Sequence, residues 1–427
     1  MSLLEREAVA VDVAARRALE ALRAGVPSRD AVRVLGSEQP HVEDRFRRQL
    51  EAARTDVAAG RHTPGLLIGG DFGTGKSHLL AHLQHVALGE GFVCSSVVIS
   101  KETPLYDPAK LYRSAIRAAV VPGRKGSAVH ELAARLDPDD AQVAALIHWV
   151  SRSDVGLNSR FAATLFLFLR VRDPEVRERI IAFWSGDPLG VSPLRAWLRA
   201  HGEASTYRLE NVPASELALQ RFAFLPRLAI AAGYAGWVLL LDEVELIGRY
   251  SFKQRARAYA ELARWSGKLK NASVPGLPAV FAITSDFDAA VLHERNDLEV
   301  IPGKLRASER EADHVLASQA EYGMRFIGRD IVRLKGLDRA SLDRVHQQVR
   351  ELYAQVYGWD VPDHEAGERL STTRLRQYVR RWINEWDLKR LYPEYARGET
   401  VIEALAPDYS EAPGLEITDE SPVAGEP

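Results

Sequence analysis

The stretch GLLIGGDFGTGKSHLL, residues 65–80, decides the fold. A short apolar run leads into a glycine-rich turn, and an apolar stretch with helical spacing follows the turn. We expect a strand over residues 65–69 and a helix from about Lys76 to Leu88. Residues 70–77 match the pattern G-x-x-x-x-G-K-[ST] at every fixed position, in the strand–loop–helix context that the pattern requires. The sequence therefore predicts a loop that cradles phosphates.

The residue types of this loop suit that chemistry. Glycines permit the backbone angles that turn several N–H groups toward one anion, and the following helix directs its positive end at the same point. Lys76 supplies a mobile charge for the β- and γ-phosphates, and the Ser77 hydroxyl is a ligand for Mg²⁺. The residues predicted to contact the nucleotide are Gly70, Asp71, Phe72, Gly73, Thr74, Gly75, Lys76, Ser77 and His78.

Two further apolar runs end in polar side chains. The run WVLLLDEVE reads as a buried strand over about 236–243 that ends in Asp242 and Glu243. Such carboxylates are tolerated at the carboxyl edge of a parallel sheet, where ligands bind. Asp242 can hold Mg²⁺ there, mostly through water, and Glu243 can orient the attacking water.

The second run is PAVFAITSD, residues 278–286, which reads as another strand. The hydroxyl of Ser285, or less favourably that of Thr284, can reach the γ-phosphate or the attacking water. The alternative is a cap for the next segment, and the pattern leaves both open.

Composition restricts the class of protein. The chain has 427 residues, 46% of them hydrophobic, and a net charge of −2, so no overall basic field draws it to nucleic acid or to an anionic membrane. No apolar run is long enough to cross a bilayer, and the single cysteine, Cys94, fits a reducing compartment. We expect a cytoplasmic α/β protein without membrane contacts.

The pattern divides the chain into an N-terminal helical segment (1–60), a nucleotide-binding domain (61–328), a helical lid (329–404) and an acidic, disordered tail (405–427). Helical patterns over about 123–234 form an insertion within the nucleotide-binding domain. The insertion is either a contact surface for a partner or DNA, or a cap on the core.

The order of these elements resembles the AAA+ P-loop ATPases with a parallel sheet, most of all the initiator clade of origin-recognition factors. The resemblance implies that residues 70–77 are Walker A, that Asp242 and Glu243 are Walker B, and that Ser285 is sensor 1. It also implies two arginine roles. Sensor 2 would be Arg376 or Arg374, which lie roughly 200° apart on one helix, and the surrounding spacing favours Arg376. The arginine finger from a neighbouring subunit would be Arg325, with Arg329 as second candidate.

A more specific similarity covers most of the chain. The phrases ALEALRAGVPSRDAVRVLGSEQPHVEDRF (18–46), VVISKETPLYDPAKLYRSAI (97–116) and LLLDEVELI (239–247) resemble the BREX system ATP-binding proteins, in particular their BrxD branch. This resemblance implies an accessory ATPase of bacterial antiphage defence that uses ATP and Mg²⁺ and works with other BREX components.

Alternatives from other classes stay open. ATP binding without turnover would make the chain a nucleotide-controlled binding module, and the locally basic lid would suit a DNA-loading factor. Only a short stretch follows Trp386, so no winged-helix DNA-binding module is expected. Assembly into a homo-oligomer also stays open. GTP is disfavoured, because no Asn-Lys-x-Asp segment is present.

Overall fold

The fold is a mixed α/β arrangement built on one six-stranded sheet. The computed structural model describes residues 3–25, 28–71, 73–203, 205–269, 272, 274–336, 338–362 and 375–395. The acidic tail predicted over 405–427 lies outside these residues. Within them, no helix has the length and apolar character needed to cross a membrane.

The sheet has the order β3-β2-β4-β5-β1-β6, and only the short β3 runs antiparallel to its neighbour. Its strands are β1 (Leu66–Gly69), β2 (Val93–Val98), β3 (Ala119–Val120), β4 (Trp237–Asp242), β5 (Ala279–Ile283) and β6 (Val332–Arg333). This confirms the mostly parallel α/β sheet predicted from the apolar runs. Because β5 lies between β4 and β1, the carboxyl ends of these three strands share one edge, where α/β proteins bind ligands.

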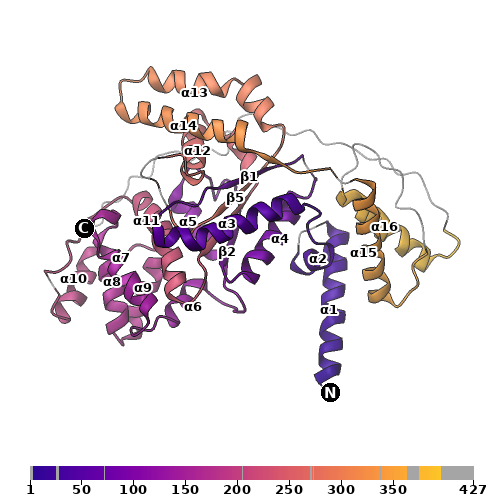
Figure 1. Ribbon diagram of the computed structural model, residues 1–427, viewed down its shortest axis with the longest axis horizontal. Helices are drawn as coiled ribbons and strands as arrows, with labels where there is room; N and C mark the ends of the chain where they lie inside the picture. Colours follow the sequence, from indigo (N-terminus) through magenta and orange to yellow (C-terminus); the bar gives the residue numbers. More distant parts are fainter. Residues whose placement is uncertain are drawn as a thin grey trace.

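The α-helices surround this sheet and extend beyond both of its ends (Figure 1). They are α1 (Leu3–Ala24), α2 (Arg29–Leu35), α3 (Pro40–Ala59), α4 (Lys76–Gly89), α5 (Pro108–Arg117), α6 (Ala128–Ala134), α7 (Ala141–Val150), α8 (Ser159–Arg170), α9 (Pro174–Ser185), α10 (Val191–Ala200), α11 (Ala214–Ala231), α12 (Phe252–Trp265), α13 (Asp297–Arg306), α14 (Glu311–Asp330), α15 (Arg339–Tyr357) and α16 (Leu375–Leu391). Two short 3₁₀ helices, η1 (Ser153–Val155) and η2 (Val244–Arg249), and a π-helix, η3 (Asp288–Glu294), complete the described elements.

Helices cover both faces of the sheet, as the continuous apolar strands require. Along β4, Leu240 faces a core formed with α3 and α4, whereas Leu239 faces the opposite core with α5, α11, α12 and α14. Alternation with a period of two in each strand therefore produces a three-layer packing. The predicted insertion contains α6 to α11, and these helices share the second core.

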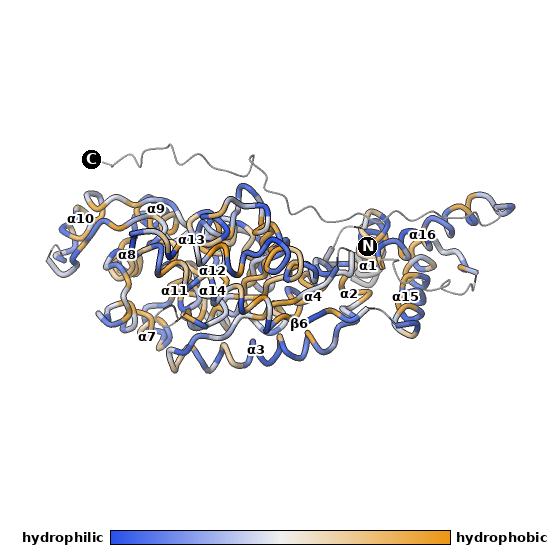
Figure 2. Tube along the Cα trace, turned by 90° about the horizontal axis from the view of Figure 1, so that it is seen from above, coloured by the Kyte–Doolittle hydropathy of each residue, from blue (hydrophilic) through white to orange (hydrophobic). Residues whose placement is uncertain are grey.

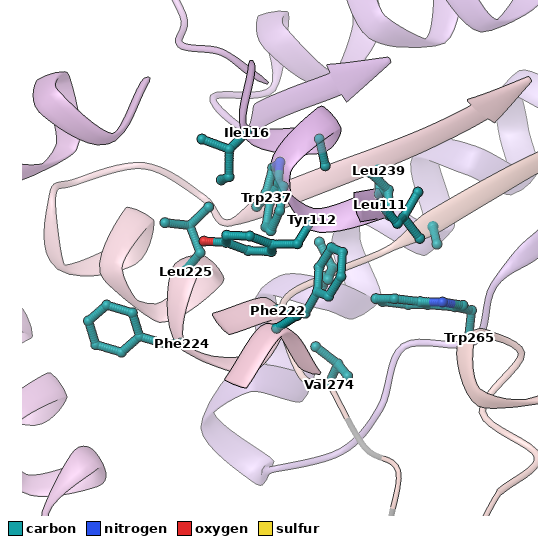
Figure 3. Close-up of a cluster of buried hydrophobic side chains, with 14 of the residues drawn as sticks. Leu111, Tyr112, Ile116, Phe222, Phe224, Leu225, Trp237, Leu239, Trp265 and Val274 are labelled. Carbon is teal, nitrogen blue, oxygen red and sulfur yellow. The ribbon is translucent and has the colours of Figure 1, made fainter. Parts of the chain in front are cut away.

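An aromatic cluster joins the insertion to the sheet (Figure 3). Phe222 of α11 packs edge-on against Tyr112 and Trp265, with 5.0 Å between ring centroids in each pair, and it stacks on Trp237 of β4 at 5.7 Å. The indole N–H of Trp237 donates to the hydroxyl of Ser95, 2.8 Å away, so this buried ring keeps a partner for its polar atom. The middle of α11 is thereby fixed on the sheet, and β4 is the next strand along the chain.

A separate core lies at one end of the molecule. There α1 and α2 pack with α15 and α16, and the fully buried residues include Leu19, Tyr353 and Trp386. Figures 1 and 2 both place this group at the opposite end from α7 to α10. The first sixty residues therefore contribute to two cores, because α3 packs on the sheet while α1 and α2 pack on α15 and α16.

Candidate nucleotide-binding site

The loop between β1 and α4 has the backbone shape that its glycines predict. Gly73 and Gly75 have φ angles of 78° and 94°, in the left-handed region that other residues adopt only with strain. A Cβ atom at Gly70 would lie 2.5 Å from the Thr74 hydroxyl, so a side chain at this position would have to displace Thr74. The chain thus closes into a compact turn directly before the first helical turn of α4.

Lys76 points back into this turn. Its side chain is 8% exposed, and its ammonium donates to the carbonyl oxygens of Gly70, at 2.9 Å, and Asp71, at 3.4 Å. The cation is therefore held at the mouth of a loop whose glycines allow close approach of an anion. These features fit the phosphates of a nucleotide.

The acidic strand ends beside Lys76. Asp242, 6% exposed, closes β4, and one of its carboxylate oxygens accepts from the backbone N–H of Glu243 at 3.0 Å. Burial and the Asp242 carboxylate raise the pKa of Glu243, and the charge of Lys76 opposes this rise. The loop and the acidic pair, far apart in sequence, therefore act on each other electrostatically.

Glu243 itself has an unusual backbone. Its φ of 59° and ψ of 34° lie in the left-handed region, which costs a non-glycine residue on the order of 1–3 kcal/mol. The strained residue turns the chain from β4 directly into η2. As a result, the side chain of Glu243 is exposed at the sheet edge instead of continuing the strand.

A third carboxylate, which the sequence analysis did not single out, lies closer to the lysine. Glu245 on η2 is 5% exposed, and its Oε1 lies 3.7 Å from the ammonium of Lys76. Burial raises the pKa of Glu245 to about 7, against the opposing effect of Lys76. In the sequence, Glu245 is visible only as the last acid of the segment DEVE. Its side chain points inward because the left-handed turn at Glu243 starts a 3₁₀ helix.

The polar end of β5 meets the loop as well. The Ser285 hydroxyl donates to a carboxylate oxygen of Asp71, whereas Thr284 is fully buried. This contact follows from the register of the sheet, in which Ile283 lies opposite Gly69. Of the two hydroxyl groups considered, Ser285 is the one that the fold brings to the loop.

Arg333 was also missed as a neighbour of the site. It ends β6, opposite Gly69 of β1, and its guanidinium donates to the carbonyl oxygen of Ser285 at 3.3 Å. From the sequence, this segment was predicted only as the beginning of the helical lid. Its pairing with β1 places an exposed cation beside the carboxyl edge of the sheet.

The arginines proposed for the sensor 2 and finger roles make other contacts. A Cβ atom at Gly25 would lie 2.9 Å from the side chain of Arg376, so this arginine lies against the end of α1. Arg325 on α14 is 55% exposed and lies 3.9 Å from Glu321, and Arg329 is exposed near the end of the same helix. Among the described contacts none joins these three arginines to the loop. Phe72 and Arg374 lie outside the described residues.

The site contains few side chains that could bind a metal ion. In the described part of the chain, no group of three or more His, Cys, Asp or Glu side chains gathers as a metal site. Ser77 in the first turn of α4 and Asp242 at the end of β4 have the oxygen donors that Mg²⁺ prefers. A nucleotide-bound Mg²⁺ keeps several waters and phosphate oxygens, so this small donor set fits such an ion better than a metal held by the protein alone.

His78 connects the site to the N-terminal helices. Its Nε2 lies 2.7 Å from the carbonyl oxygen of Gly36, which caps α2, and burial lowers the pKa of the ring. The neutral imidazole can donate to that carbonyl. The turn after α2 is therefore in contact with the helix that carries Lys76 and Ser77.

Comparisons with known proteins identify the family of the chain. No curated protein and no solved structure matches the chain. The family model described as BREX system ATP-binding protein BrxC/D matches residues 12–135 and 212–390, which include the loop, the acidic strand and most of the lid. The unmatched residues 136–211 contain α7 to α10. The match covers more than half of the chain, which therefore belongs to the BrxC/D family of BREX system ATP-binding proteins.

Proposed function

We propose that the chain is a Mg²⁺-dependent ATPase of the AAA+ type that acts as an accessory enzyme of an antiphage BREX system. Within its family, we assign it to the BrxD branch. Family membership supports ATP as the ligand. The observation that carries the proposal is the meeting of three separate segments at one sheet edge. Lys76 acts on Glu243 and lies near Glu245, and Ser285 donates to Asp71 in the loop.

The geometry suggests a role for each group. The N–H groups of the loop and the Lys76 ammonium bind the phosphates, and Ser77 and Asp242 hold the metal ion through oxygen atoms and water. When bound, Mg²⁺ neutralises charge on the transferred phosphoryl group. Glu243, exposed at the strand end, orients the attacking water and accepts its proton, and Ser285 helps to position the reacting group.

Complete activity in this proposal needs further cations. Arg376, or Arg374, acts as sensor 2, and Arg325, or Arg329, is supplied by a second copy of the chain within a homo-oligomer. Both roles rest on the resemblance to AAA+ proteins. The exposure of Arg325 is compatible with a contact between copies.

A second candidate function is a nucleotide-controlled binding module. The contact of His78 with Gly36 favours it, since nucleotide at α4 could fix the position of the N-terminal helices and of the lid core. A DNA-loading role has weaker support. Arg381 pairs with Glu385 at 3.1 Å and Arg390 with Asp387 at 3.9 Å, so part of the basic charge of α16 is neutralised within the helix.

The deciding experiment measures ATP binding and phosphate release by the full chain, alone and with duplex DNA and other BREX proteins. We expect Lys76→Ala to lose affinity for ATP and Glu243→Gln to bind ATP without releasing phosphate. Unchanged ATP binding by Lys76→Ala would refute the site. Phosphate release by the wild type that never exceeds that of Glu243→Gln would support the binding module instead.

A further inference from the structure

The ion pair of Lys76 with Glu245 has no role in the proposed hydrolysis. Both side chains are nearly inaccessible, 8% and 6% exposed, and the two charged atoms are 3.7 Å apart. Among the described residues, no other residue donates a hydrogen bond to the carboxylate of Glu245, on which the backbone N–H of Glu245 itself acts. The lysine, in contrast, also donates to the carbonyl oxygen of Gly70.

A buried carboxylate that lacks hydrogen-bond donors from other residues needs a nearby cation to stabilise its charged form. Removing a charged group from water is expensive, and hydrogen bonds normally offset part of that expense. Here the charged side chains that act on Glu245 are Lys76, which stabilises the carboxylate, and Glu243 and Asp242, which repel it. Apart from the backbone N–H of Glu245 itself, the attraction that favours the ionised form of this carboxyl group is therefore exerted by the cation that phosphates would also attract.

We propose that Glu245 is a positioning residue that holds Lys76 at the loop and competes with the nucleotide phosphates for this cation. This inference rests on the proposed binding of ATP at residues 70–77. Without nucleotide, Lys76 is shared between Glu245 and the carbonyl oxygens of Gly70 and Asp71. When phosphates enter, the lysine charge turns toward them, and Glu245 loses part of its compensation. The affinity for ATP is therefore lower than the loop alone would provide.

The competition has a signature that depends on the length of the phosphate chain. The lysine of such a loop reaches the β- and γ-phosphates, so ATP and ADP compete with Glu245, whereas AMP does not. Glu245→Gln keeps the shape of the side chain and removes its charge. We expect this variant to bind ATP and ADP about tenfold more tightly, equivalent to about 1.4 kcal/mol, and to bind AMP as the wild type does.

The test is calorimetric titration of the full chain with ATP, ADP and AMP. Glu261→Gln is the matched control, because Glu261 is a buried carboxylate on α12 that pairs with Arg264 and does not contact the loop. Glu245→Asp, whose carboxylate is drawn back from Lys76, should give an intermediate gain and serves if the glutamine variant does not fold. In a Lys76→Ala background, Glu245→Gln should no longer change the affinity.

The outcomes separate this inference from the proposed function. Weaker or unchanged ATP binding by a folded Glu245→Gln protein, or an equal gain for AMP, overturns the competition while leaving the ATP site intact. If the wild type does not bind ATP, or if Lys76→Ala binds it equally well, the proposed site and the inference both fail.

Discussion

The imidazole of His78 lies 2.7 Å from the carbonyl oxygen of Gly36 and so connects the glycine-rich loop at residues 70–77 to the N-terminal helices. His78 directly follows Ser77 in α4, and Gly36 ends α2. Because α2 shares its core with α1, α15 and α16, a displacement at the first turn of α4 can reach α15 and α16 through the contact of α4 with α2.

Replacing this histidine should loosen that connection. We expect His78→Ala to lower the free energy of unfolding by about 1 kcal/mol, the contribution of one hydrogen bond, and to speed amide exchange in α2. His82→Ala is the control, because His82 lies on the same helix but contacts Glu43 of α3 at 2.7 Å. Hydrogen exchange followed by mass spectrometry measures both effects. Equal protection of α2 in the two variants would contradict the connection.

Gly75, the N-cap of α4, and Gly89, the last residue of α4, differ in backbone conformation, although both have open space where a side chain would lie. A Cβ atom at either Gly75 or Gly89 would meet nothing within 4 Å, yet only Gly75 has a positive φ, of 94°. Gly75→Ala should therefore destabilise the loop by about 1–2 kcal/mol and weaken ATP binding, through strain alone. Gly89→Ala should leave binding unchanged. Denaturant unfolding and ATP titration check the pair, and similar affinities in both variants would show that the left-handed turn is not needed.

Much of the sheet could be predicted because its central strands are buried on both faces. Such strands read as continuous apolar runs, and the runs at 66–69, 237–242 and 279–283 end within a few residues of the expected positions. The loop at residues 70–77 could also be predicted, because its glycines and Lys76 have the fixed spacing of a known sequence pattern. The ends of β4 and β5 also pointed to Asp242 and Ser285 as polar side chains at the same sheet edge.

Other features depend on long-range packing and were not readable. The association of α1 and α2 with α15 and α16 joins segments more than three hundred residues apart, as the hydrogen bond between Arg23 and Tyr357 illustrates. Local periodicity describes a helix and its apolar face but not the partner of that face. Glu245 was missed for a different reason, since its inward direction follows from the left-handed backbone of Glu243.

The strain at Glu243 can be measured by exchanging it for glycine. Since glycine adopts a φ of 59° without strain, Glu243→Gly should raise the free energy of unfolding by about 1 kcal/mol and abolish phosphate release. Glu351→Gly, in the interior of α15, should lower the stability by about 1 kcal/mol, because glycine is unfavourable in a helix. Urea unfolding compares the two variants. A loss of stability in both would mean that the backbone at Glu243 carries no strain.

The last prediction concerns pH. The pKa of Glu245 rises from 4.5 to about 7 on folding, chiefly through burial, so between these values the folded protein binds more protons than the unfolded chain. The contribution of this group to stability is therefore greatest below pH 4.5 and is lost as the pH rises toward 7, by about 3 kcal/mol at most. Glu245→Gln removes this titration. Its stability relative to the wild type, measured by urea unfolding without nucleotide, should rise between pH 5 and pH 8, and a constant difference would show that Glu245 does not titrate in this range.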